Sequence, residues 1–329
     1  MDRSMTRTCR RSLEPRARSR CRSGASVSKL KAPTGAPRVS VLCSLYRGGE
    51  FIEEYLDNIT SQTIFREHCE LIVIDANSPE NEGETIERFA RSFPQIVYRR
   101  LPFRAGIYAA WNAGVEISRG EYLTNANLDD LRRADSLEIQ AATLDSLPFV
   151  DVVYQDFLYS FEPHLSFEDI AAVGVVSDLP IVTPHNLMRF NSPHNAPMWR
   201  RSVHDAIGLF DETYRSAGDY EFWVRACRAG KTFFKTNDPH VAYYVNPQGI
   251  STSGNTRGIE EARMISKRYW HTLSPPPAVE EMPDFSRRHL GKKAGSGLPD
   301  SVTRYDVIQS ALRHATAEHE RALNTGQAS

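Results

Sequence analysis

Short apolar runs of strand length alternate with amphipathic helical segments along this chain, beginning at Val39. Residues 39–45 (VSVLCSL) are almost entirely apolar, which is typical of a strand buried on both faces. Over residues 50–60 apolar side chains recur at the spacing of one helix face, and a second apolar run follows at residues 71–75 (LIVID). Strands that alternate with helices favour a mostly parallel sheet that helices cover on both faces.

The same pattern predicts the remaining elements of a single main α/β domain. They are a helix over 86–93, a strand over 96–100, a helix over 107–115, a strand over 122–126, a helix opened by a capping box of Asp135 and Glu138, and a strand over 150–154. After Asp156 the pattern loosens. It then resumes with helices over 202–208, 220–229 and 256–272, and with strands over 233–235 and 241–245.

The two ends of the chain differ in composition from this domain. Of the 40 Lys and Arg residues ten fall within residues 1–35, with only two of the 41 acids, so the remainder carries 30 basic and 39 acidic residues. We expect residues 1–36 to be disordered, because they hold too few apolar side chains to fold. Their composition also matches a transit peptide without its amphipathic face, and a start codon assigned too early would look the same. Residues 37–273 form the predicted domain, and residues 274–329 a linker with a predicted helix over 301–323.

Charge and apolar content limit the class of protein. The acidic body argues against a nucleic-acid partner, which needs a basic face. No run approaches the roughly 18 apolar residues that span a bilayer, so no transmembrane segment is expected. The five cysteines are scattered and odd in number, which favours a reduced, cytoplasmic setting. Peripheral association with the inner membrane face stays open.

Residues 120–130 (GEYLTNANLDD) carry the strongest chemical signal. They read as a buried strand that ends in two carboxylates, Asp129 and Asp130. Mg²⁺ takes oxygen ligands and shares its remaining positions with water and substrate phosphates, so one or two carboxylates suffice to hold it. Ligands of parallel sheets bind at the carboxyl ends of the strands, where Asp75 is also expected. The alternative is a plain polar turn after a strand.

Several motifs in one order resemble the family 2 glycosyltransferases, whose nucleotide-sugar domain has the GT-A fold. They are VSVLCSLYRGGEFIEEYLDNITSQT from Val39, LIVIDANSPENE from Leu71, GIYAAWNAGV from Gly106, GEYLTNANLDD, PMWRR from Pro197, GLFDE from Gly208, SAGDYEFWVRA from Ser216 and YYVNPQGIST from Tyr243. The resemblance covers about residues 37–255. It implies transfer of a sugar, with inversion and with Mg²⁺ or Mn²⁺, from a UDP-, dTDP- or GDP-linked donor. The acceptor would be a hydroxyl of a glycan, a lipid-linked glycan or a small molecule, as in polysaccharide synthesis.

The resemblance also implies a donor site. Asp75 matches the carboxylate that accepts a hydrogen bond from the base, although a solvated acid at a strand end is the alternative. The residues Tyr46, Asn77 and Arg104 complete the expected donor contacts, and Arg104 is equally well read as a solvated arginine.

Asp129 matches the acid that chelates the metal bridging the diphosphate, with Asp130 beside it. Asn127 departs from the family pattern, which has Asp at this place, so it brings an amide where a negative charge is expected. His240 lies where some relatives supply a further metal ligand, but a lone His is more often structural.

Asp219, in GDYEFW, matches the catalytic base, which takes a proton from the acceptor hydroxyl. A first-turn helix acid is the alternative, and Glu221 is the fallback base. The family pattern has Glu directly before the base, whereas this chain has Gly218.

The segment with His194, Asn195 and Trp199 is the expected acceptor wall, since aromatic faces pack well against sugar rings; Trp199 is equally well read as core. Two other functions stay open at this point. One is a nucleotidyltransferase, although YRGGEF from Tyr46 is only a faint match to its phosphate loop. The other is a non-catalytic nucleotide-sugar-binding scaffold, which Asn127 and Gly218 make conceivable.

Overall fold

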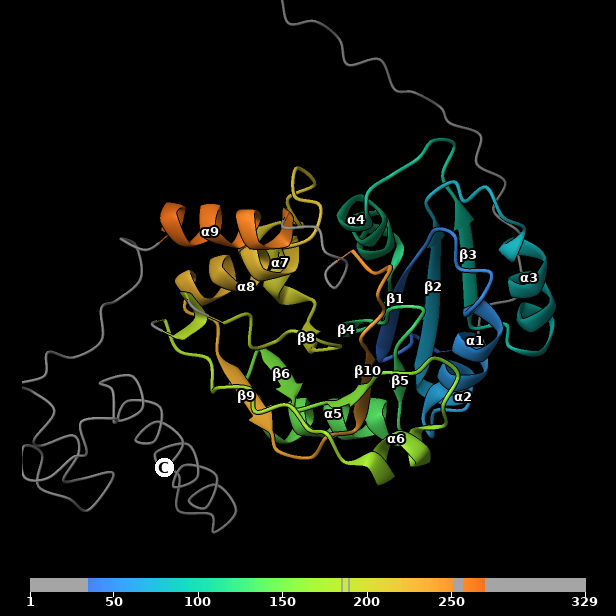
Figure 1. Cartoon of the computed structure of the whole chain (residues 1–329), viewed down its shortest axis with the longest axis horizontal. Coiled ribbons are helices and arrows are strands. Elements are labelled where there is room, and N and C mark those ends of the chain that lie inside the picture. The colour runs from blue at the N-terminus through green and yellow to red at the C-terminus, as the bar shows by residue number, and fades with distance from the viewer. Residues whose placement is uncertain (1–34, 185, 189, 251–256, 270–329) are drawn as a thin grey trace, which may run out of the picture.

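The computed structural model describes residues 35–184, 186–188, 190–250 and 257–269 (Figure 1). The predicted C-terminal linker and helix lie outside these residues, and so does the predicted disordered segment apart from its last two positions. The described chain forms a large mixed sheet with helices on both faces and a small second sheet at one side (Figure 1). The predicted α/β fold class, with a mostly parallel sheet flanked by helices, is thereby confirmed.

The large sheet has seven strands. In spatial order they are β3 (Ile96–Arg100), β2 (Cys69–Asp75), β1 (Val39–Leu45), β4 (Tyr122–Asn125), β8 (Met198–Arg200), β6 (Val152–Gln155) and β9 (Phe233–Thr236). Only β8 runs antiparallel to its neighbours in this sheet. Because β1, β2, β3 and β4 are mutually parallel, their carboxyl ends meet at one edge, where ligands bind in such sheets.

Helices cover both faces of the sheet because the strand side chains are apolar on both sides. In β1, Val41 and Cys43 pack into the core on one face, while Leu42 packs into the core on the other. The first face is covered by α1 (Ile52–Thr60), α2 (Phe65–His68), α3 (Glu82–Ser92) and α5 (Ser136–Ser146). The second is covered by α4 (Ile107–Ile117), α7 (Ser202–Ile207), α8 (Gly218–Arg228) and α9 (Arg257–Tyr269) (Figure 1).

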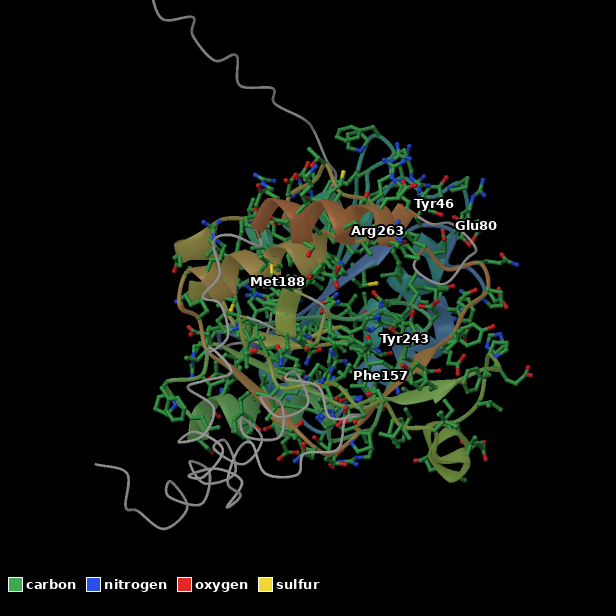
Figure 2. All side chains as sticks on the ribbon, turned by 60° about the vertical axis from the view of Figure 1, so that its left-hand side comes forward. Tyr46, Glu80, Phe157, Met188, Tyr243 and Arg263 are labelled. Atoms are coloured by element: carbon green, nitrogen blue, oxygen red, sulfur yellow. The ribbon has the colours of Figure 1, made fainter. Side chains whose placement is uncertain are left out.

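The sequence pattern did not predict the second sheet as a unit. It consists of β5 (Leu131–Arg132), β10 (Val241–Tyr244) and β7 (Leu158–Ser160), in that order. The predicted strand at 241–245 therefore exists, but it belongs to this small sheet. Figure 2 shows Phe157 and Tyr243 lying together here, with ring centroids 5.5 Å apart. The short elements α6 (Phe167–Val173) and the 3₁₀ turn Asn186–Met188 were also unpredicted.

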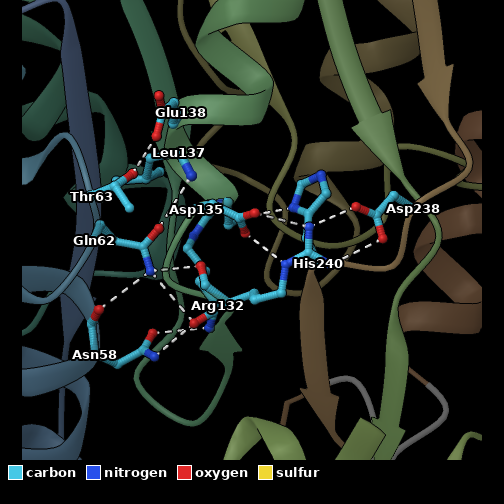
Figure 3. Close-up of polar contacts among 11 residues, drawn as sticks. Asn58, Gln62, Thr63, Arg132, Asp135, Leu137, Glu138, Asp238 and His240 are labelled. Carbon is cyan, nitrogen blue, oxygen red and sulfur yellow. Dashed lines mark hydrogen bonds and ion pairs between the residues drawn. The ribbon is translucent and has the colours of Figure 1, made fainter.

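The predicted capping box at the start of α5 is wrong in its contacts. Asp135 occupies the N-cap position, but its side chain makes no capping hydrogen bond and instead pairs with Arg133 at 2.6 Å. Glu138 accepts a hydrogen bond from the Thr63 hydroxyl at 2.7 Å (Figure 3). The arginine competes for the aspartate more effectively than the helix N–H groups do, since charge-assisted pairs are the stronger bonds.

Candidate functional site

A cavity of about 640 Å³ opens at the carboxyl edge of the large sheet. Its walls come from the segments that follow β1, β2 and β4, from the segment before α4, and from the chain at and beyond the end of β10. Its volume is within the range of about 300–1,000 Å³ that small-molecule sites occupy. Both its place and its size therefore suit a nucleotide sugar.

Tyr46 and Arg104 meet in this cavity. The guanidinium carbon of Arg104 lies 3.0 Å from the centroid of the Tyr46 ring, and both side chains line the cavity. Burial lowers the pKa of Arg104, which nevertheless stays cationic at neutral pH. The two residues form a fixed pair that offers a planar face and a positive charge.

Asp129 and Asn127 also line the cavity, and they follow β4. Asp129 Oδ2 accepts a hydrogen bond of 3.0 Å from the amide of Asn246. Asn127 Nδ2 donates to Asp130 Oδ2 at 2.8 Å, so the amide supports the neighbouring acid. An aspartate at position 127 would set two carboxylates against each other there, which explains why an amide fits.

Asp130 is turned away from the cavity. Its side chain is buried, Oδ2 accepts from Asn127, and Oδ1 accepts from the backbone N–H of Tyr244 at 3.2 Å. Burial, followed by the charge of Asp129, raises the pKa of Asp130 well above its usual range. Of the two adjacent acids, Asp129 is the one that faces the cavity.

Asp75 is fully buried at the end of β2 and is not among the residues that line the cavity. Its carboxylate accepts from the backbone N–H of Ser78 at 2.7 Å, from Tyr98 Oη at 2.7 Å and from Arg100 Nη1 at 2.8 Å. These three groups already donate hydrogen bonds to the Asp75 carboxylate. Its predicted contact with the base of a nucleotide sugar stays a prediction.

The sequence pattern gave no role to Arg100, which proves to be a partner of Asp75. It pairs across β2 and β3 with Asp75 in the sheet register, and Nη2 donates to Asn77 Oδ1 at 3.2 Å. Asn77 sits in the left-handed region with a φ of 62°, a conformation that Asn tolerates better than most residues. The sequence pattern predicted both strands but not that they are neighbours, so it gave no reason to pair Arg100 with Asp75.

Asp219 is the second residue of α8 and its carboxylate is held on both oxygens. Oδ1 accepts from Tyr108 Oη at 3.2 Å, and Oδ2 accepts from Asn191 Nδ2 at 2.7 Å. Burial raises the pKa of Asp219, although the hydrogen bond from Asn191 acts in the opposite direction. The fallback base Glu221 is excluded by its surroundings, since it is 1% exposed and bonded to Arg225 and Tyr269.

Tyr108 explains why glycine precedes Asp219. A Cβ atom at Gly218 would lie 2.6 Å from Cε2 and 2.7 Å from Cδ2 of the Tyr108 ring, which is closer than packed atoms approach. The ring is itself buried and packs edge-on against Trp111, with centroids 5.5 Å apart. The acid that the family pattern places before the base is therefore sterically excluded here.

We expect Gly218→Ala to destabilise the protein by about 1–3 kcal/mol, because overpacking outweighs the roughly 0.5–1 kcal/mol that alanine gains over glycine in a helix. Thermal unfolding followed by circular dichroism measures the loss. Gly106→Ala is the matched control, since a Cβ there meets nothing within 4 Å. Equal melting temperatures for the two variants would contradict the steric explanation.

The segment before β8 supplies two of the three predicted acceptor residues. The His194 ring stacks on Phe157 and lies edge-on to Tyr243, with centroids 5.4 Å and 5.1 Å away. Among the described residues, His194 Nδ1, Asn195 Nδ2 and Asn191 Oδ1 are buried without a hydrogen-bond partner. Unpaired buried polar atoms are costly, so this cluster favours a ligand that donates and accepts hydrogen bonds.

Trp199 is not part of that wall. It is a β8 residue with 0% exposure, packed against Trp223 with ring centroids 5.5 Å apart, and its indole N–H donates to His204 Nε2 at 3.1 Å. Its prediction as an acceptor contact is wrong because its whole side chain is core.

His240, the third predicted metal ligand, is not among the residues that line the cavity, and its metal role stays a prediction. The ring is fully buried, its Nδ1 lies 2.9 Å from Ser136 Oγ, and it sits among Arg132, Asp135 and Asp238 (Figure 3). Burial first, and then the charge of Arg132, lowers the pKa of His240 to about 4. Within the described part of the chain, no three His, Cys, Asp or Glu side chains converge on a metal position. A cation here would have to share its coordination with substrate oxygens, as Mg²⁺ does.

Comparison with solved structures identifies the fold class. S. aureus TarS 1–349 in complex with UDP-GlcNAc superposes with a TM-score of 0.58 at 17% identity, covering 88% of this chain and 92% of that one. The mannosyltransferase PcManGT of Pyrobaculum calidifontis, in complex with GDP-Man and Mn²⁺, gives a TM-score of 0.51 at 18% identity, covering 87% and 88%. The fold is thus that of the GT-A glycosyltransferases.

The family follows from the sequence comparison. The model described as glycosyl transferase family 2 matches residues 40–207, slightly more than half of the 329-residue chain, and the protein belongs to this family. An uncharacterized glycosyltransferase of Rickettsia felis is 24% identical over 257 residues, 74% of this chain and 40% of that protein. The uncharacterized glycosyltransferase EpsJ of Bacillus subtilis is 22% identical over 319 residues, 87% and 89% of the two chains.

The matches cover only part of some relatives and do not all include Asp219. The chain spans between 40% and 63% of the lengths of three rickettsial relatives. Asp219 also lies beyond the residues that the family model matches.

In the described ranges, no helix is both long and apolar enough to cross a membrane.

Proposed function

We propose that this protein transfers a sugar from a nucleoside diphosphate donor to a hydroxyl group of an acceptor, with inversion at the anomeric carbon and with a divalent cation. The observation that carries the proposal is the link between the Asp219 carboxylate and the cavity. Tyr108, which bonds Asp219, follows Ile107 of the cavity wall, and the ring of His194, whose charge when protonated would lower the pKa of Asp219, packs on Tyr243 of that wall.

The donor half of the proposal rests on the cavity. Arg104 supplies a cation for the diphosphate, and the Tyr46 ring supplies a face against which a base or sugar ring can lie. Asp129, with Asn127 beside it, would hold Mg²⁺ or Mn²⁺ together with diphosphate oxygens, and the cation would neutralise charge on the leaving nucleoside diphosphate. The two solved structures of similar fold contain UDP-GlcNAc in one case and GDP-Man with Mn²⁺ in the other.

The acceptor half rests on Asp219 and on the segment with His194 and Asn195. In the proposed step, Asp219 takes the proton of the acceptor hydroxyl while that oxygen bonds to the anomeric carbon. The bond from this carbon to the diphosphate oxygen breaks on the opposite side, which inverts the configuration. Because burial raises the pKa of Asp219, the carboxylate is a stronger base than an exposed aspartate.

The acceptor would be recognised by hydrogen bonds in the wall beside Asp219. The unpartnered atoms of Asn191, His194 and Asn195 offer both donors and acceptors. A sugar hydroxyl both donates and accepts, so a glycan or lipid-linked glycan satisfies this set better than an apolar acceptor does.

Donor binding tests the proposal first. We expect one nucleotide sugar of a panel of UDP-, dTDP- and GDP-linked donors, with Mn²⁺, to raise the melting temperature by roughly 5 °C or more near saturation. Release of the matching nucleoside diphosphate should then follow, slowly to water and faster with an acceptor. Pyrophosphate release from a nucleoside triphosphate and a sugar phosphate would instead identify a nucleotidyltransferase. Binding without any turnover would identify a scaffold.

A further inference from the structure

The turn that precedes α8 is held by a carboxylate from another helix. Glu261 of α9 accepts hydrogen bonds from three consecutive backbone N–H groups, those of Arg215 at 3.0 Å, Ser216 at 2.8 Å and Ala217 at 2.9 Å. Its side chain is 4% exposed. Burial alone would raise the pKa of Glu261, but the three N–H groups outweigh burial and lower it, so the group is anionic at neutral pH.

The next N–H groups at the start of α8 lie close to Tyr108 and Asp219. After the three that reach Glu261, those of Gly218 and Asp219 face the Tyr108 hydroxyl, and that of Tyr220 faces the Asp219 carboxylate. The next N–H, from Glu221, makes the first helical bond to the carbonyl of Ala217 at 3.0 Å. Glu261 therefore binds the N–H of the N-cap residue Ala217 and the two N–H groups before it, so these three donors are not available to another anion.

Helix α9 packs against α8, and this packing holds Glu261 in place (Figure 1). At one end, a Cβ on Gly258 would lie 2.8 Å from Ser216 Oγ, which means that the two backbones approach closely there. At the other end, Tyr269 Oη donates to Glu221 Oε1 at 2.6 Å, and Ile265 between them is fully buried. No part of α9 lies within the residues that the family model matches.

We propose that Glu261 is a positioning residue for sugar transfer: it fixes the turn that presents Asp219 and keeps a negative charge behind that turn, so that Asp219 stays a strong base. This inference rests on the proposed function. Asp219 is two residues beyond Ala217, so the Cα atoms of these two residues are at most about 7 Å apart. Two unit charges separated by a distance of this order in a partly hydrated site shift each other's pKa by about half a unit to one unit.

Within the described part of the chain, Tyr214, Arg215 and Tyr220 of the turn and the start of α8 lie beside this pair, and further charged and titratable groups come from four elements. They are Tyr108 of α4, His194 of the segment before β8, Arg257 and Tyr269 of α9, and Glu221 and Arg225 of α8. Arg257 pairs with the Glu261 carboxylate, with its Nε 3.4 Å from Glu261 Oε1. Removing Arg257 should thus act on Asp219 in the direction opposite to removing the charge of Glu261.

Glu261→Gln tests the proposal, with Glu260→Gln as the matched control, because Glu260 is an exposed acid on the same helix. We expect Glu261→Gln to lower kcat about tenfold, to leave the donor KM unchanged and to move the acid limb of the kcat profile down by about half a unit to one unit. We expect Arg257→Gln to move that limb up by a smaller amount, since Arg257 is half exposed. Glu260→Gln should match the wild type.

Carbon-13 NMR titration of the Asp219 carboxyl, assigned with Asp219→Asn, gives the same pKa shifts without any substrate. This measurement separates two failures. If the wild type transfers no sugar but the NMR shifts appear, the proposed function is wrong and the Glu261–Asp219 coupling is right. If neither Glu261→Gln nor Arg257→Gln moves the pKa of Asp219, the inference is overturned. Should Glu261→Gln unfold, Arg257→Gln alone decides, because it leaves the carboxylate in place.

Discussion

Asp219→Asn is expected to abolish sugar transfer, with kcat lower by about a thousandfold or more, because a missing general base costs roughly 10²–10⁴ in rate and its charge is lost as well. Binding of the nucleotide donor should not change, since Asp219 is not among the residues that line the cavity. Radiolabelled or coupled transfer assays measure the first effect, and calorimetry with the nucleoside diphosphate and Mn²⁺ measures the second.

The fold should tolerate this change. Tyr108 can still donate to the amide oxygen at position 219, and Asn191 can turn its unpartnered Oδ1 toward the new NH₂ group. The pKa of Asp219 is raised in the folded chain, so ionisation of this acid lowers stability as the pH rises through that pKa. An uncharged amide removes this cost, and the melting temperature at neutral pH should be equal or higher.

Retained transfer in Asp219→Asn would remove this residue from the mechanism. A fall in activity that tracks a fall in melting temperature would point instead to a structural role. Glu87→Gln, which changes an exposed acid on α3, controls for the loss of one negative charge.

Asp129→Asn is expected to lower the metal-dependent affinity for the donor by about a hundredfold, since a neutral amide contributes far less than a carboxylate to holding Mg²⁺ or Mn²⁺. The shape is kept, because the amide oxygen can still accept from Asn246. Titrations of the nucleoside diphosphate with and without Mn²⁺ separate the metal-dependent part of binding from the rest. In the variant, the two titrations should become nearly equal.

An unchanged response to Mn²⁺ in Asp129→Asn would show that the cation is held elsewhere or is not needed. Asp57→Asn serves as the control, because Asp57 is an exposed acid of α1 that does not line the cavity. The buried Asp130 is unsuitable as a control, since its oxygens bond Asn127 and the backbone of Tyr244.

Periodicity predicted the parallel half of the sheet well, because each of its strands is a long apolar run followed by an amphipathic helix. The predicted strand at 96–100 agrees with β3 at both ends. Periodicity did not predict β8 (Met198–Arg200), because this antiparallel strand has only three residues and is too short to give a pattern. For the same reason, the sequence could not decide between the two interpretations of Trp199, an acceptor contact or a core residue.

Motif order brought Tyr46, Arg104, Asn127 and Asp129 to one cavity, because they follow strands whose ends must meet. It could not find Tyr108 or Glu261. A tyrosine or a glutamate inside a helical pattern gives no sign that its polar atom reaches another element. In the folded chain, Tyr108 of α4 bonds Asp219, and Glu261 of α9 bonds the turn before it.

The close approach of Gly218 and Tyr108 should constrain how these two positions evolve. A side chain at position 218 needs the space that the Tyr108 ring fills, so neither position can change freely while the other is kept. Among descendants of this chain, the two positions should therefore vary together. Lineages that regain an acid before Asp219 should first have replaced the tyrosine by a smaller residue.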